Sequence, residues 1–256
     1  MRNILRLSIA ACAIVLWISP ARAAEDDVNA LIDNAIKAKG GADKLGKIKA
    51  MVWKSKGKYY GTSDKGEEYT EAMTFELPDK LHFEVQSDHE GMKVSFAQVF
   101  DGAKGWSSIN GKTEEMSKDQ AAEVKEGLYA HRLGMLYPLK EKGIKLTSLG
   151  DVRVGDKTGV GVKASSEGHR DVTLVFDKKT YLLLKVEVQA KDFNDPNVKN
   201  PKEVTEEIFF DDYKRVGGIQ EAHKMVMLRA GKKLVEGEVT EIKTPEKIDP
   251  KMFEKP

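Results

Sequence analysis

The residue types that most often carry out chemistry are sparse in this chain. It has five histidines, His82, His89, His131, His169 and His223. None of them has a second histidine or a cysteine at the spacing of a zinc-binding pair, so the sequence predicts no metal site. His82 and His223 fall on the polar faces of predicted strands, and His89 and His169 fall in predicted turns. These positions are typical of solvated side chains.

Two further groups invite a chemical interpretation. His131 and Arg132 lie together in a predicted helical segment, where they could form a polar latch over a binding site; an exposed surface pair is the simpler interpretation. Asp211 and Asp212 place two carboxyl groups at the end of a predicted strand. Paired carboxylates suit acid–base catalysis or calcium binding, but a turn at the strand end explains them better.

No other catalytic motif is present. The serines do not stand in a nucleophile-elbow pattern, and the chain has neither a phosphate-binding loop nor a dinucleotide fingerprint. The sequence therefore predicts a protein that is not an enzyme and has no cofactor. A hydrolase remains an alternative only if folding brings a serine, a histidine and an aspartate together.

Residues 1–23 form a predicted secretory signal peptide. Arg2 and Arg6 precede an apolar run, Leu7–Ile18, that is short for a membrane span. Ala21-Arg22-Ala23 ends the segment with small residues at the two positions that a signal peptidase recognises. We therefore expect export to the periplasm, with a mature chain that begins near Ala24.

The one cysteine, Cys12, lies within this leader. The stretch Ile9-Ala-Ala-Cys12 is similar to a lipoprotein processing site, but the apolar stretch before the cysteine is only a few residues long. Without the leader the chain has no disulfide and no thiol chemistry. The formal net charge is +1, and removing three arginines and no acid gives +1 − 3 = −2. Nucleic-acid binding through bulk positive charge is therefore excluded.

Hydrophobic periodicity predicts a mainly β protein. An amphipathic helix starts at Asp26 or Asp27 and ends at Gly40-Gly41. From Met51 the period changes to 2, and tight turns separate short segments that are typical of an antiparallel meander. The predicted strands are 51–60, 69–77, 81–86, 92–97, 105–109, 144–154, 159–166, 171–177, 181–193, 204–215, 219–229 and 234–243.

The interval 117–140 is predicted to be helical. Ser117 and Gln120 form a capping-box pattern, while Gly127 and Gly134 weaken a helix and Pro138 stops one. We therefore expect two short helices, 121–125 and 128–139. Together with the N-terminal helix they are the candidates to cover one face of a strongly curved sheet.

The apolar side chains of the strands have two interpretations. They could line a cavity for a flexible ligand, or they could form a solid core beneath the helices; the high strand count and the glycine-interrupted helical cover favour the cavity. The candidate lining residues are Met73, Phe75, Phe83, Met92, Phe96, Leu174, Phe176, Val186 and Met225. The candidate lid residues are Leu128, His131, Leu133, Met135 and Leu136.

Four segments carry a resemblance to a known family. They are Ala38–Leu45 running into Ile48–Trp53, Phe100–Trp106, Val175–Val186, and Asp212–Lys224 followed by Ile248–Phe253. Their order and spacing resemble the outer-membrane lipoprotein-sorting proteins and their periplasmic relatives. Ala222 departs from the pattern, since many relatives have proline there, and no arginine of this chain can be matched to the one credited with gating in the true carrier.

The resemblance implies an unclosed antiparallel β-barrel, plugged by helices, in a single domain at residues 24–256. It also implies a monomeric carrier that holds a lipid, acyl chain or lipoprotein and engages envelope membrane proteins without making or breaking bonds. The alternative is an envelope interaction module of the same fold with a filled core, because a shared fold does not establish a shared activity.

Overall fold

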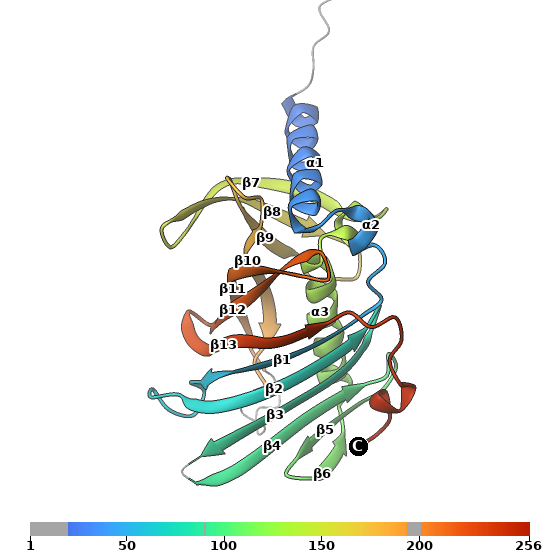
Figure 1. Ribbon diagram of the computed structural model, residues 1–256, viewed down its shortest axis with the longest axis vertical. Helices are drawn as coiled ribbons and strands as arrows, with labels where there is room; N and C mark the ends of the chain where they lie inside the picture. Colours follow the sequence, from blue (N-terminus) through green and yellow to red (C-terminus); the bar gives the residue numbers. More distant parts are fainter. Residues whose placement is uncertain (1–19, 90, 194–200) are drawn as a thin grey trace, which may run out of the picture.

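In the computed structural model, thirteen antiparallel strands form one sheet within the described residues, which are 20–89, 91–193 and 201–256 (Figure 1). The predicted signal peptide, apart from its last four residues, lies outside them. The strands are β1 (Ala50–Tyr59), β2 (Glu67–Glu76), β3 (Lys80–His89), β4 (Met92–Phe100), β5 (Gly105–Ile109), β6 (Lys112–Glu115), β7 (Lys145–Val154), β8 (Lys157–Ser165), β9 (Val172–Asp177), β10 (Leu183–Lys191), β11 (Glu203–Val216), β12 (Ile219–Arg229) and β13 (Lys232–Lys243).

The sheet consists of two meanders joined at the middle. Its strand order is β6-β5-β4-β3-β2-β1-β13-β12-β11-β10-β9-β8-β7, so every neighbouring pair is consecutive in the chain except β1 and β13. The edge strands β6 and β7 do not pair with each other. The sheet is therefore an unclosed barrel, as predicted.

Twelve of the strands confirm the predicted segments, and their pairing brings apolar residues of neighbouring strands to one face. Phe75 lies opposite Met51 and Leu81, so these side chains share one face. The same register turns Glu84 and Lys93 outward, where both are exposed. The prediction missed β6, because its four polar residues have no apolar alternation and form a strand only by completing the hairpin at Asn110-Gly111.

The N-terminal helix α1 (Pro20–Lys39) begins earlier than predicted, since Pro20 rather than Asp26 is its first residue. Its predicted apolar stripe is confirmed, with Ile32 and Ala35 fully buried. Gly40 and Gly41 end it at φ angles of 147° and 93°, in the left-handed region that favours glycine. The short helix α2 (Ala42–Leu45) follows.

The prediction of two short helices at 117–140 is wrong. A single helix, α3 (Lys118–Gly134), runs through Gly127 and is followed by the 3₁₀ helices η1 (Tyr137–Lys140) and, near the end of the chain, η2 (Pro250–Phe253). The predicted capping box of Ser117 and Gln120 is confirmed. Glycine costs about 1 kcal/mol in a helix, but burying Leu128 and Leu133 stabilises α3 by about 1.5–3 kcal/mol each.

The sheet curves around α3 (Figure 1). On one side Leu128 packs against Met51, Phe75 and Phe100 of β1, β2 and β4. On the other side Tyr129, Ala130 and Leu133 belong to a second cluster with β8, β9, β10 and the stripe of α1. One helix thus fills the inside of the curve, while α1 contacts β7 and β12.

Candidate functional site

The face of the sheet that carries Phe75 and Leu174 contacts the helices, and we call it the inner face. Beyond α3 it continues as half-buried apolar side chains, because alternate residues of each strand keep the same orientation. We call this set the inner apolar surface. Its members are Met73, Phe83, Val85, Phe96, Ile208, Met225, Met227, Val235 and Val239.

The structure divides the predicted cavity residues into three groups. Phe75, Leu174, Phe176 and Val186 are buried in the two packed clusters beneath the helices. Met73, Phe83, Phe96 and Met225 belong to the inner apolar surface, with the Phe83 and Phe96 rings in edge contact at 6.2 Å between centroids. Met92 is 63% exposed at the end of β4. Contact of any of them with a ligand stays a prediction.

The predicted lid residues lie in the helical cover but do not form one surface. Leu128 and Met135 pack toward β1, β2 and β4, whereas Leu133 and Leu136 pack toward the cluster shared with α1. Leu136 is not helical: it has a φ of 74° and connects α3 to η1. All four side chains are buried, so α3 would have to move for a ligand to lie beneath it.

His131 is not the exposed surface residue that the simpler interpretation predicted. Its ring packs against Phe75 at 4.2 Å and Trp53 at 5.0 Å between centroids. Burial lowers its pKa to about 4, with a smaller contribution from the positive charge of Lys39, so the imidazole is neutral at pH 7. Its Nε2 atom is buried without a hydrogen-bond partner. Arg132, by contrast, pairs with Glu141 at the surface.

A group of polar side chains on β1 and β2 interrupts the apolar inner face. Ser55 and Glu71 are directly opposite each other, and Tyr69 follows on the same side of β2. The Trp53 indole donates a hydrogen bond of 3.3 Å to Glu71. We call Ser55, Tyr69 and Glu71 the polar triplet. Sequence reasoning missed it, although Glu71 was a signal: an acid among the apolar residues of that side of β2.

A second buried polar contact lies between α1 and β12. Lys39 and Glu221 form an ion pair of 3.1 Å, and both side chains are 13% exposed. Burial and the charge of Glu221 raise the pKa of Tyr213, whose hydroxyl donates a hydrogen bond to the Leu183 carbonyl. The opposite charges of Lys39 and Glu221 neutralise each other at this buried position.

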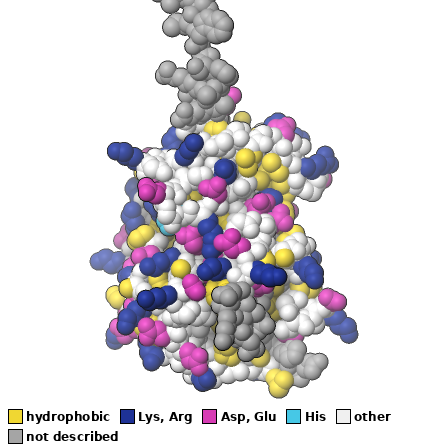
Figure 2. All heavy atoms as spheres, turned by 180° about the vertical axis from the view of Figure 1, so that it is seen from behind, with side chains coloured by type: hydrophobic (Ala, Val, Ile, Leu, Met, Phe, Trp, Pro, Cys, Tyr) yellow, Lys and Arg dark blue, Asp and Glu magenta, His cyan; other side chains and the backbone are white. Residues whose placement is uncertain are grey.

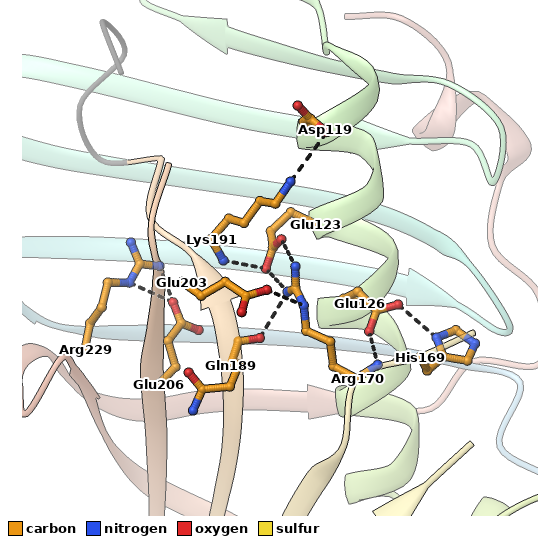
Figure 3. A network of polar contacts seen from close by, with 10 residues as sticks. All are labelled: Asp119, Glu123, Glu126, His169, Arg170, Gln189, Lys191, Glu203, Glu206 and Arg229. Carbon is orange, nitrogen blue, oxygen red and sulfur yellow. Dashed lines mark hydrogen bonds and ion pairs between the residues drawn. The ribbon is translucent and has the colours of Figure 1, made fainter. Parts of the chain in front are cut away.

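A polar network fastens the outward side of α3 to the sheet (Figure 3). Arg170, before β9, makes two hydrogen bonds to the Glu123 carboxylate at 2.6 and 3.0 Å, and its backbone N–H donates to Glu126. His169 bonds the same Glu126 at 2.9 Å and stacks on Tyr129. Bidentate arginine–carboxylate pairs are among the stronger polar contacts, so the network restrains α3.

The other residues with a chemical interpretation are accounted for by local contacts. His82 contacts Glu84 and the Met252 carbonyl, and His223 contacts the Glu221 carbonyl. Asp211 pairs with Lys157. No cluster of histidine, cysteine, aspartate or glutamate in the described chain is suited to a metal ion. No described helix has the length and hydropathy needed to cross a membrane.

The opposite, outer face of the sheet is hollowed as well. A broad depression of about 1570 Å³ crosses β1–β4 and β11–β13 and is bounded by the β7–β8 hairpin. Its floor alternates in charge, with Lys56 opposite Glu238 and Glu238 opposite Lys224. Figure 2 shows acidic and basic side chains similarly intermixed when the molecule is seen from behind. Such alternation is typical of a solvated surface.

No protein-family model matches this chain, and no curated protein matches it in sequence. Its structure is similar to a LolA superfamily protein from Nitrosomonas europaea, with a TM-score of 0.55 and 8% identity over 89% of this chain and 97% of that chain. It is also similar to a DUF1329 family protein from Desulfovibrio piger, with a TM-score of 0.51 and 10% identity over 89% and 97%. The chain thus has the fold of a LolA superfamily protein, which confirms the expected unclosed barrel with helices on its inner face.

Proposed function

We propose that this protein is exported to the periplasm and binds the alkyl part of a lipid, acyl chain or lipoprotein on its inner face, without bond chemistry. The observation that carries the proposal is the inner apolar surface: the apolar face continues past α3, where Met73, Phe83 and Phe96 are only half-buried. Burial of alkyl carbon there would contribute about 0.8 kcal/mol per methylene group. The LolA-like fold supports the same interpretation.

The ligand would reach the inner apolar surface from the side that α3 does not cover. Three methionines, Met73, Met225 and Met227, lie on this surface, and methionine adapts its shape to flexible chains. Displacement of α3 would enlarge the surface by exposing Phe75 and Leu128. The network around Arg170 and the buried side chains Leu128 and Leu133 would both add to the free energy that this movement costs.

An envelope interaction module is the second candidate, and one observation favours it. The cluster beneath α1 and α3 is filled, with Ile32, Leu133, Leu174 and Phe176 fully buried. A ligand beneath these helices would have to displace packed side chains. Binding of apolar probes separates the two candidates, since only a carrier binds them with the fold intact.

The test is a titration of purified mature protein with a fluorescent fatty acid. Phe96→Glu places a charge on the inner apolar surface, and we expect it to weaken binding at least tenfold because an unpaired charge among apolar groups is costly. The matched control is Ser95→Glu, which puts the same charge on the opposite face of the same strand, where Ser95 is exposed. Circular dichroism verifies that both variants fold. Absence of binding by the folded wild type would exclude the carrier.

A further inference from the structure

The polar triplet sits where apolar residues would be expected. Val85 lies opposite Glu71 on β3, and Val239 lies opposite Ser55 on β13, so apolar side chains flank the pair on both neighbouring strands. A polar group amid such surroundings loses free energy unless a partner satisfies it. The polar groups of the triplet therefore require hydrogen-bond partners.

The two hydroxyl groups of the triplet are buried, with Ser55 4% exposed and Tyr69 5% exposed, and neither makes a hydrogen bond of good geometry. The Ser55 hydroxyl lies near both the Tyr69 hydroxyl and the Glu71 carboxyl and lowers the pKa of each by less than burial raises it. Most buried polar side-chain atoms in proteins are hydrogen-bonded, and leaving one unsatisfied costs about 1–3 kcal/mol. Two such atoms on adjacent strands lie beside a carboxyl group, so the triplet places three hydrogen-bonding oxygen groups close together.

The backbone makes room for this arrangement. Gly57 and Gly237 are paired across β1 and β13, and Tyr69 is opposite Gly57. A Cβ atom on Gly237 would lie 2.5 Å from the Tyr69 hydroxyl oxygen. The tyrosine thus reaches across β1 toward β13 only because Gly237 lacks a side chain.

Glu71 supplies the charge. Burial raises its pKa, while the Trp53 indole and the nearby Ser55 hydroxyl lower it by less. Trp53 is a neutral donor, and no lysine or arginine of the described chain forms an ion pair with this carboxyl group. A carboxylate left in this state favours a cation that can also donate hydrogen bonds.

We propose that Ser55, Tyr69 and Glu71 bind the primary ammonium head group of a ligand whose alkyl chain lies on the inner apolar surface. An ammonium group has three N–H donors, which matches one carboxylate and two hydroxyl oxygens. Met73 and Met225 lie beside the triplet and would receive the first methylene groups. This inference rests on the proposed function and names the head-group chemistry of its ligand.

The test measures displacement of bound Nile red, a neutral apolar dye, by dodecylamine, dodecanol and dodecanoate. The titration is carried out at pH 8, where the alkylamine is protonated. We expect dodecylamine to compete about tenfold more strongly than dodecanol, and dodecanoate more weakly than either. Glu71→Gln should remove the advantage of the amine without changing competition by dodecanol. Tyr69→Phe should reduce that advantage in part.

The matched control is Glu68→Gln, on the same strand as Glu71 but on the outer face, where Glu68 is exposed. It should leave all three competitors unchanged. Equal competition by amine and alcohol, or an amine advantage that survives Glu71→Gln, would overturn the head-group site while leaving the carrier intact. Failure of Nile red and all three compounds to bind the folded protein would overturn both.

Discussion

Replacement of His131 by leucine should change how stability depends on pH. The pKa of His131 is about 4 in the folded protein and 6.5 for an unperturbed histidine. Below pH 6.5 the unfolded chain takes up a proton that the folded protein cannot accept. Stability is therefore complete above pH 6.5 and decreases as the pH falls toward 4.

The size of the effect follows from the two pKa values. Between pH 7 and pH 5 this one group should cost the wild type about 2 kcal/mol of unfolding free energy. His131→Leu removes the titrating group and keeps an apolar contact for Trp53 and Phe75. Other groups titrate in both proteins, so the difference between the two pH profiles isolates His131.

Urea unfolding at pH 7, 6 and 5 provides the measurement, with the slope against denaturant checked at each pH. We expect the variant to lose less stability than the wild type on acidification, whatever its stability at pH 7. Parallel pH profiles would show that the imidazole is solvated or paired, and would refute its burial between Trp53 and Phe75.

Three further predictions concern the helical cover and the leader. Arg170→Ala should speed amide hydrogen exchange in the first half of α3 about tenfold, because Glu123 loses its bidentate partner. Leu133→Ala should lower the free energy of unfolding by about 2–5 kcal/mol in urea, because its side chain is fully buried. Mass spectrometry of the protein isolated from periplasm should give a mature chain that begins at or near Ala24.

Each has a control. Lys178→Ala breaks a surface ion pair with Asp151 and should leave exchange in α3 unchanged. Leu149 is 46% exposed, so Leu149→Ala should change stability by less than about 0.5 kcal/mol. Equal effects of the paired variants would contradict the packing described. An acylated Cys12 would contradict removal of the leader at residue 23.

Local chemistry in the sequence determined most of the sheet. Alternation with period 2 and turn residues such as Gly217-Gly218 act over a few residues. Consecutive strands therefore pair whatever the rest of the chain does. The capping box of Ser117 and Gln120 is likewise local. The strand β6 was missed because its composition has no apolar alternation, and it becomes a strand only by pairing with β5.

Only the tertiary structure decided the contents of the inner face. Gly127 predicted a break in the cover, but packing on both sides of α3 outweighs one helix-weakening residue. The His131 ring packs against Trp53 and Phe75 because α3 crosses these two residues, which are more than fifty residues away in the chain. Contacts between residues so far apart in the chain produce no periodic pattern of apolar residues in the sequence.

The polar triplet shows the same division. Its members share one side of β1 and β2, which periodicity alone could show. Their apolar surroundings could not be predicted from the sequence. These surroundings depend on β13, from the far end of the chain, pairing with β1 and bringing Gly237 and Val239 beside the triplet. A residue's face follows from local backbone geometry, whereas its neighbours and its solvation follow from strand order and helix placement.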